Sequence, residues 1–255
     1  MPRILLANDD GVEAPGLFAL AGALRGLAEL FICAPLENQS GVGSALTIGG
    51  FVDFKPFPDA PEGVPRMAVG GTPVDAVKYG LREWLRGRPP DLVVSGINWG
   101  FNIGRNVRYS GTLGAAFEAA WTGVTAIAVS CDYRDPPIWD AAVHYARLVA
   151  RHCLTRPPRP GTVLNLNVPA LPVGEVKGLR VGGMGRGGYR EEVIKDGGAS
   201  RFALAGHLEV SDSAVADVDG ALLHDGYAVL TPLALDWTDR EALAALKSEP
   251  WRSDD

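Results

Sequence analysis

Short runs of apolar residues recur through the first two thirds of the chain, and each run stops at polar or glycine-rich residues. The runs with the length of a buried strand cover residues 4–7, 30–34, 67–69, 91–95 and 125–130. Segments with helical spacing of apolar residues, such as 113–121 and 138–154, alternate with these runs. The alternation predicts an α/β fold, in which a doubly wound and mostly parallel sheet lies between two layers of helices.

Beyond the first two thirds, the alternation gives way to glycine-rich and acidic stretches with short β-like runs. Residues 239–247 are expected to form a last short helix, between Trp237 and Trp251. Aromatic residues in such a terminal segment pack either on a partner subunit or on the chain's own core. We expect one domain over residues 1–255, with a core of about 1–175 and, over about 176–255, a β-containing excursion and a C-terminal oligomerisation arm.

The first apolar run ends at two adjacent acidic residues, Asp9 and Asp10, which are followed by Gly11. In open parallel sheets, ligands bind beyond the carboxyl ends of the strands, where this turn is expected. Adjacent carboxylates repel each other, and a divalent cation between them reverses that cost, so the pair is a candidate metal site. The alternative is an ordinary turn, because Asp bonds its own backbone and Gly accepts a positive φ.

Polar residues also follow the later strands. Ser40 lies in a long loop, and Asn98 and Asn102 lie in a stretch over 96–106 that has no helical periodicity and is expected to be a loop. The segment 110–112 leads into a helix, and the first amides of a helix carry the positive end of its dipole, which suits an anion. The alternative is that a hydroxyl of this segment only caps the helix.

The polar residues collected at the carboxyl ends of the predicted strands are Asp9, Asp10, Ser40, Asn98, Asn102, Ser110 and Thr112. Each of these side chains offers oxygen. An all-oxygen set with two carboxylates suits Mg²⁺, Mn²⁺ or Ca²⁺ and disfavours zinc, which prefers nitrogen and sulfur. The pattern therefore predicts a hard divalent cation that leaves room for an anionic substrate.

Two further patterns are structural. Thr72 followed by Pro73 and Asp75 predicts a helix start with a capping box, so Thr72 and Asp75 are expected to cap and not to catalyse. Asn165 and Asn167 alternate along a predicted strand, where they can pair with a neighbouring loop.

The composition of the chain disfavours several classes of partner and cofactor. The net charge of -6 gives no basic footprint for a nucleic acid polymer. No apolar run approaches the length of a membrane span and no leader precedes Ile4, so we expect a cytoplasmic protein without a membrane partner. Cys33, Cys131 and Cys153 are far apart and are expected to be core thiols. The fold is Rossmann-like, yet the G-x-G-x-x-G turn of a dinucleotide site does not follow the first strand.

Six blocks of sequence occur together in order: Asn8–Gly11, Gln39–Gly41, Gly71–Asp75, Gly96–Gly104, Tyr109–Thr112 and Asn165–Pro169. In these blocks the chain resembles the SurE family of metal-dependent nucleotidases, from residue 4 to about residue 170. The resemblance implies a 5′-nucleotidase that removes phosphate from nucleoside monophosphates. It also implies that 3′-nucleotides and short polyphosphate are substrates of some members, and that the chains form homodimers or homotetramers with exchanged C-terminal arms.

Site residues follow from the same resemblance. By position, one divalent cation per subunit, Mg²⁺ or Mn²⁺, would be bound by Asp9, Asp10, Ser40 and Asn98, and the phosphate of the nucleotide substrate by Asn98, Asn102, Ser110, Gly111 and Thr112. The chain departs from the family pattern at Asn106, where an Asp is expected, and at the bulky Trp99 and Phe101. These departures affect the shape of the pocket and the substrate preference.

The expected reaction is phosphomonoester hydrolysis, in which the cation polarises a phosphoryl oxygen and acidifies a water molecule. The amides of Gly111 and Thr112 would stabilise the phosphoryl charge, and Asp9 or Asp10, whichever is freer, would accept the proton. An aspartyl-phosphate route with Asp9 as nucleophile is the internal alternative. Two functions of a different class also fit an acidic turn: a Mg²⁺-dependent nucleotide-binding protein without catalysis, and a receiver-like signalling module, although Ser95 and Gly96 stand where a receiver needs its phospho-acceptor Asp.

Overall fold

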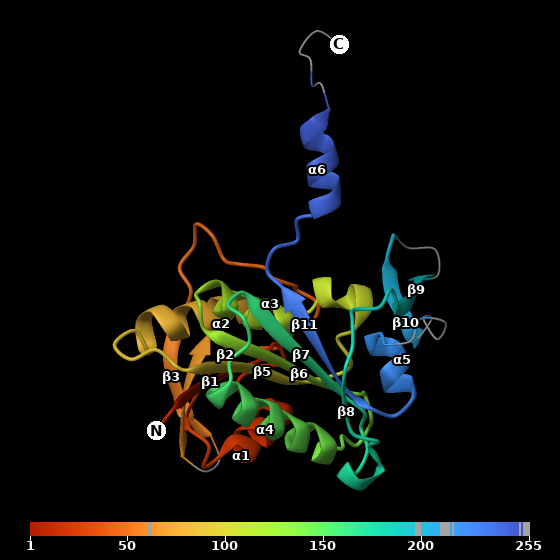
Figure 1. Cartoon of the computed structure of the whole chain (residues 1–255). Coiled ribbons are helices and arrows are strands. Elements are labelled where there is room, and N and C mark those ends of the chain that lie inside the picture. The colour runs from red at the N-terminus through yellow and green to blue at the C-terminus, as the bar shows by residue number, and fades with distance from the viewer. Residues whose placement is uncertain (61–62, 197–199, 210–214, 216, 250, 252–255) are drawn as a thin grey trace.

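A computed structural model describes the chain apart from residues 61–62, 197–199, 210–214, 216, 250 and 252–255. Within the described residues, nine strands form the central sheet, in the order β3-β4-β2-β1-β5-β6-β7-β11-β8 (Figure 1). These strands are β1 (Arg3–Ala7), β2 (Glu29–Pro35), β3 (Phe54–Ala60), β4 (Val64–Val69), β5 (Leu92–Trp99), β6 (Thr125–Cys131), β7 (Thr162–Val168), β8 (Leu179–Val181) and β11 (Ala228–Ala234). The adjacent strands β4, β2, β1, β5, β6 and β7 all pair in parallel, which confirms the predicted doubly wound sheet.

Helices connect the strands and cover both faces of the sheet. The α-helices are α1 (Pro15–Leu24), α2 (Pro73–Tyr79), α3 (Gly111–Trp121), α4 (Asp140–Thr155), α5 (Asp219–His224) and α6 (Arg240–Ser248). The part of the chain that the structure describes also contains the shorter helical turns η1 (Gly80–Trp84), η2 (Gly104–Arg108) and η3 (Val173–Glu175). The predicted helices at 113–121, 138–154 and 239–247 are confirmed, with ends that differ by one or two residues.

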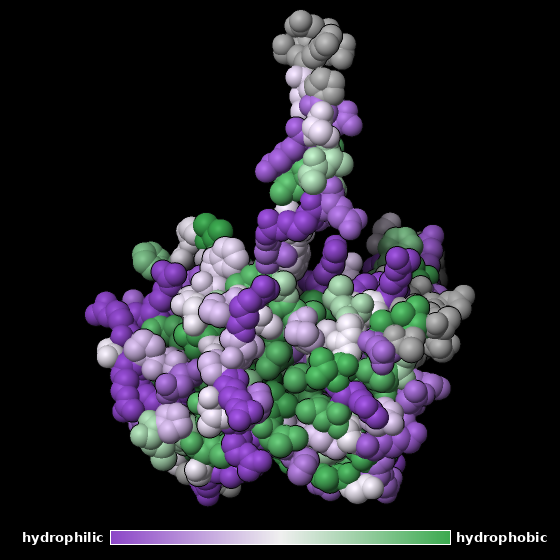
Figure 2. Space-filling view, viewed as in Figure 1, coloured by the Kyte–Doolittle hydropathy of each residue, from purple (hydrophilic) through white to green (hydrophobic). Residues whose placement is uncertain are grey.

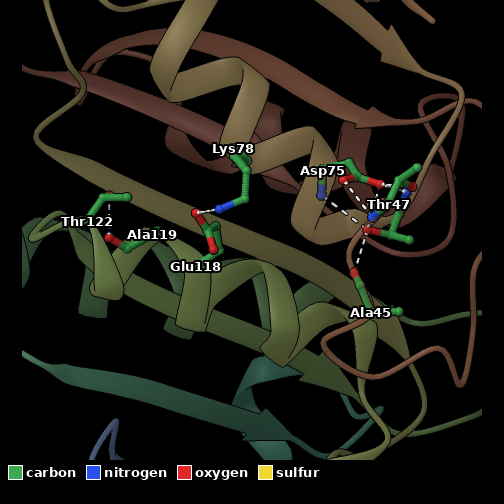
Figure 3. Close-up of polar contacts among 8 residues, drawn as sticks. Ala45, Thr47, Asp75, Lys78, Glu118, Ala119 and Thr122 are labelled. Atoms are coloured by element: carbon green, nitrogen blue, oxygen red, sulfur yellow. Dashed lines mark hydrogen bonds and ion pairs between the residues drawn. The ribbon is translucent and has the colours of Figure 1, made fainter. Parts of the chain in front are cut away.

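The sheet separates two hydrophobic layers. Ile4 and Leu6 of β1 pack in the layer that contains α1 and α4, whereas Leu5 packs with α2 and α3 on the other face. Successive side chains of a strand point to opposite faces, so a strand covered on both sides must be apolar throughout. Lys78 of α2 also contacts Glu118 of α3 across 2.5 Å, which links the two helices of the second layer (Figure 3).

Strand β5 extends further than the sequence indicates. The sequence predicts a loop over residues 96–106, but the strand continues to Trp99, with a register shift against β6 between Ser95 and Asn98. Gly96 makes this possible, because its φ is +135° and a Cβ there would lie 2.2 Å from the carbonyl oxygen of Val129. The loop expectation is therefore wrong for residues 96–99, and Asn98 stands on a strand.

Antiparallel pairs occur near both edges of the sheet. Strand β3 pairs antiparallel with β4, and its Pro56 and Pro58 are tolerated because β3 is an edge strand. At the other edge, β11 pairs antiparallel with β7 and parallel with β8. The extension after residue 175 therefore contributes two strands to the central sheet.

The rest of the extension lies outside the central sheet. Strands β9 (Gly188–Lys195) and β10 (Phe202–Glu209) form a separate antiparallel hairpin beside α5 (Figure 1). Of the β-containing excursion and arm expected over about 176–255, residues 197–199, 210–214, 216, 250 and 252–255 lie outside the described residues. Among the described residues, each helix is too short or too polar to cross a bilayer.

Helix α6 projects away from the body of the protein, and its surface carries both hydrophobic and hydrophilic side chains (Figures 1 and 2). None of its described residues is buried. At the base of this C-terminal arm, the ring of Trp237 lies edge-on to Phe117, with ring centroids 6.4 Å apart, and the guanidinium of Arg108 lies 5.8 Å from the Trp237 ring centre. The arm is thus anchored at its base and exposed along its length.

Candidate active site

A cavity of about 680 Å³ opens at the carboxyl ends of β1 and β5. In the sheet, β1 lies between β2 and β5. The strands that follow β1 in the sequence are added first on its β2 side and then, from β5 onward, on its other side, so the strand order reverses at β1. Such a reversal of strand order is where open α/β sheets bind ligands. Of the residues predicted to form the site, those that line the cavity are Asp9, Ser40, Asn98, Asn102 and Ser110, whereas Asp10, Gly111 and Thr112 do not line it.

Asp9 is held firmly beside the start of α3. It is 3% exposed, and its Oδ1 accepts a hydrogen bond of 2.6 Å from the hydroxyl of Thr112. Burial raises the pKa of Asp9, while the Thr112 hydroxyl and the amides of Thr112 and Gly111 lower it in part. The first amides of α3 therefore act on the carboxylate of Asp9, which fixes its position at the cavity wall.

Asp10 is more open than Asp9. Burial, followed by the negative charge of Asp9, raises the pKa of Asp10 to about 6, and the amide of Trp99 opposes this shift. The side-chain nitrogen Nδ2 of Asn38 donates a long hydrogen bond of 3.5 Å to Asp10 Oδ1. The two carboxylates thus form a site where negative charge is unfavourable unless a cation neutralises it.

The donor set fits a hard divalent cation. The candidate ligands Asp9, Asp10, Ser40 and Asn98 offer oxygen from carboxylates, a hydroxyl and an amide. Within the described part of the chain, no cluster of three or more His, Cys, Asp or Glu side chains could hold a metal. A zinc site of the usual nitrogen and sulfur type is therefore not found there, and the two-carboxylate set remains the candidate.

The loop that carries Ser40 is tied to the acidic turn and to the start of α3. The amide of Gln39 donates to the backbone oxygen of Asp9 at 2.7 Å, and the amide of Gly43 donates to the backbone oxygen of Tyr109 at 2.9 Å. These bonds hold the exposed Ser40 at the cavity, although 31 positions separate it from Asp9 in the sequence.

Asp75 holds the far end of the same loop. It completes the predicted capping box with Thr72, which the structure confirms. It also accepts hydrogen bonds from the hydroxyl of Thr47 at 2.7 Å and from the Thr47 amide at 3.2 Å (Figure 3). The hydroxyl of Thr72 donates to the backbone oxygen of Ala45 at 2.7 Å. The two capping residues thus position the loop as well as the helix, a role that the motif does not reveal.

Asn102 is clamped through its main chain by two side chains of β7. Its amide donates to Asn167 Oδ1 at 2.8 Å, and its carbonyl oxygen accepts from Asn165 Nδ2 at 2.8 Å and Asn167 Nδ2 at 3.2 Å. The side chain of Asn102 donates to the hydroxyl of Ser130 at 2.8 Å. The prediction that the alternating asparagines pair with a neighbouring loop is confirmed.

The entry to α3 combines capping and positioning. Ser110 Oγ accepts a bond of 3.1 Å from the amide of Leu113, so its side chain caps the helix, as the capping alternative predicts. Thr112 is fully buried, and its hydroxyl is used by Asp9. Ser110 nevertheless lines the cavity, so the entry to α3 borders the site, and the first amides of the helix reach it through the carboxylate of Asp9.

Comparison with known proteins identifies the family of this chain. The profile of the family described as Survival protein SurE matches residues 4–191. The chain belongs to the SurE family. It is 41% identical over 251 residues to 5′-nucleotidase SurE of Anaeromyxobacter sp. (strain Fw109-5), with 96% of this chain and 95% of the relative covered.

Other SurE proteins match over nearly their whole length. The 5′/3′-nucleotidase SurE of Yersinia pestis is 39% identical over 250 residues, which cover 97% of this chain and 96% of the relative. The crystal structure of SurE protein from Aquifex aeolicus superposes with a TM-score of 0.84 at 32% identity, and the match covers 96% of this chain and 98% of that chain. The agreement confirms the α/β fold.

The three positions at which the sequence is expected to depart from the family pattern lie together. Trp99, Phe101 and Asn106 all line the cavity, and Trp99 is 38% exposed. A departure at these positions would therefore alter the wall of the cavity.

The sequence does not predict the contribution of the hairpin. Leu204 and Ala205 of β10 line the cavity, more than 190 positions from Asp9. The amides of Gly104 and Gly185 both donate to the buried Asp219 at 2.9 Å, which joins the η2 region to the base of the hairpin. The one sequence signal for this contact is Asp219 at the start of the short helix α5, and an acidic residue in such a position is too common to predict the contact.

Proposed function

We propose that this SurE-family protein is a phosphomonoesterase that depends on a divalent metal and hydrolyses nucleoside 5′-monophosphates to nucleoside and phosphate. The observation that carries the proposal is the buried Asp9 beside Asp10, at a cavity that Ser110 at the entry to α3 also lines. The relatives named 5′-nucleotidase support the substrate class. The relative named 5′/3′-nucleotidase extends the proposal to 3′-monophosphates, and the family resemblance extends it to short polyphosphate.

In this proposal, Asp9, Asp10, Ser40 and Asn98 hold one Mg²⁺ or Mn²⁺ per subunit. When bound, the cation supplies positive charge that polarises a phosphoryl oxygen and lowers the pKa of water. The phosphate is held by Asn98, Asn102 and Ser110, with Gly111 and Thr112 contributing the dipole of α3.

Asp10 is the better proton acceptor of the two carboxylates. Asp9 is buried and tied to the Thr112 hydroxyl, whereas Asp10 is less buried, so Asp10 is the freer of the two carboxylates. For the same reason we rank water attack above an aspartyl-phosphate formed on Asp9, whose Oδ1 accepts the Thr112 hydrogen bond. A binding module without catalysis and a receiver-like module gain no support, since the relatives are named as nucleotidases.

The proposal is tested by phosphate release from a panel of nucleoside 5′- and 3′-monophosphates. We expect release in the presence of Mg²⁺ or Mn²⁺, loss of release after treatment with a chelator, and recovery when either cation is added back. Hydrolysis that persists in the chelator would contradict the metal dependence. Absence of release from every ester, with both cations, would remove the proposed activity.

We also propose a homodimer or homotetramer that uses the C-terminal arm. Leu246 of α6 is 50% exposed, and a terminal helix without a buried residue gains its packing from another copy. We expect sedimentation velocity to show a dimer or tetramer for the full chain and a smaller species for Leu246→Glu. Lys247→Glu, at a neighbouring exposed position, is the matched control and is expected to retain the assembly. A full chain that sediments as a monomer would refute the assembly.

The three cysteines support a cytoplasmic location, which remains part of the proposal. Cys33, Cys131 and Cys153 are free and buried, as the sequence predicts for core thiols. Burial raises the pKa of Cys131 to about 12 and that of Cys153 to about 11, so these thiols stay protonated. Free thiols of this kind are typical of a reducing compartment.

A further inference from the structure

The cavity has an aromatic wall beside its polar floor. Trp99, Phe101 and Tyr109 line the same cavity as Asp9 and Ser110. A volume of about 680 Å³ falls within the range of roughly 300–1,000 Å³ that accommodates an organic ligand of drug size. A phosphate group alone would leave most of this space, including the aromatic wall, unused.

Trp99 is fixed in place from outside the cavity. Its ring stacks on the ring of Tyr133, with centroids 4.5 Å apart and planes 18° apart. Its Nε1 donates a hydrogen bond of 3.2 Å to the backbone oxygen of Arg134. The side chain follows Asn98 directly on β5, so its position relative to the candidate metal site is set by the strand. A ring that is already immobilised loses little conformational entropy when a ligand stacks on it.

We propose that Trp99 is a stacking platform for the base of the nucleotide. This inference rests on the proposed function, because it assigns the base-recognition part of the same site. Every base offers a π face that can stack on an aromatic side chain. The cavity wall is also uncharged at this point, which suits a neutral base and leaves the acidic turn and α3 to the phosphate.

The decisive measurement compares an ester that has a base with one that lacks it. Adenosine 5′-monophosphate and ribose 5-phosphate share the reacting group, so the ratio of their kcat/KM values isolates the contribution of the base. Trp99→Ala is expected to lower this ratio roughly tenfold, mainly through the KM for the nucleotide. Trp99→Phe keeps a ring and is expected to recover most of the ratio.

Trp121 provides the matched control. It is 73% exposed on α3 and lines a different hollow, so Trp121→Ala removes an exposed indole without touching the site. We expect the ratio to remain unchanged in this variant. If Trp99→Ala fails to fold, Tyr133→Ala removes the stacking partner instead and is expected to lower the ratio by a smaller factor.

A binding experiment separates the platform from catalysis. Adenosine has no phosphate, so it reports stacking without turnover and without metal. We expect adenosine to quench part of the tryptophan fluorescence of the wild type and not of Trp99→Phe. Equal quenching in the two proteins, or a kcat/KM ratio that is the same in wild type and Trp99→Ala, would overturn the platform. Absence of phosphate release from both esters would instead remove the proposed function, and the adenosine result would still decide the platform.

Discussion

Asp10→Asn is expected to lower phosphate release from nucleoside monophosphates by roughly 100-fold or more. The substitution removes one of the two carboxylates proposed to hold the cation, and it also removes the proposed proton acceptor. The amide has nearly the same shape, so the loss reflects chemistry and not packing. Steady-state kcat/KM with saturating Mg²⁺ or Mn²⁺ measures this effect, and Mn²⁺ binding to the same variant gives an independent readout.

The metal-free Asp10→Asn protein is expected to be more stable than the metal-free wild type, although it is less active. The folded-state pKa of Asp10 is raised to about 6 from its ordinary value of 3.8, so the ionised carboxylate destabilises the folded state once the pH rises above that range. Asparagine carries no charge, and we expect Asp10→Asn to unfold at a higher temperature than the metal-free wild type at a pH of about 8. Lower activity together with higher stability would exclude misfolding as the cause.

Glu13→Gln is the matched control for this prediction. Glu13 is an exposed carboxylate of the same turn region, three positions from Asp10, and it does not line the cavity. We expect its kcat/KM to stay within about twofold of the wild type, as for other surface substitutions away from a site. Equal turnover in Asp10→Asn and wild type would remove Asp10 from the reaction.

Gly111→Ala is expected to reduce both activity and stability. A Cβ at this position would lie 2.7 Å from Asp9 Cβ, 2.9 Å from Asp9 Oδ2 and 3.1 Å from Pro73 Cγ. Because Asp9 is buried, either its carboxylate or the start of α3 must move. A displacement of this kind is expected to lower kcat/KM roughly 100-fold, and overpacking is expected to lower the free energy of unfolding by about 1–3 kcal/mol.

Gly22→Ala makes the same chemical change in a helix where space is open. Gly22 lies within α1, and no atom approaches a Cβ there within 4 Å. Alanine favours the helix over glycine by about 1 kcal/mol, so this variant is expected to be slightly more stable and fully active. Urea denaturation and kcat/KM of the two variants test the contrast. A fully active and equally stable Gly111→Ala would show that the contact with Asp9 imposes no constraint.

The sequence predicts the layers of the fold because a strand that is buried on both faces has apolar residues at successive positions. Strand β1 is apolar at each of residues 4–7, which is what a strand covered by helices on two sides requires. The capping box of α2 is equally readable, since its contacts lie within three residues. The extension of β5 is not readable, because it depends on the positive φ of Gly96 and on the approach of Val129 from a different strand.

The candidate site is predictable in outline for a topological reason. Parallel strands end at one edge of a sheet, so polar residues that follow β1 and β5 must lie near each other. The supporting contacts are not predictable, because they join distant parts of the chain. The bond between Thr112 and Asp9 spans 103 positions, and the hairpin residue Leu204 comes from a segment without a clear pattern. The sequence therefore indicates which residues meet but not how they are held.

The clamp on Asn102 has a consequence for altering this protein. Asn165 and Asn167 hold only the amide and the carbonyl group of residue 102, groups that every amino acid except proline possesses. The main-chain bonds that set the path of the chain here are therefore available to any residue except proline. A substitution at position 102 would remove the side-chain bond to Ser130 and the proposed phosphate contact while these main-chain bonds remain possible, so it would test the side chain separately from the path of the chain.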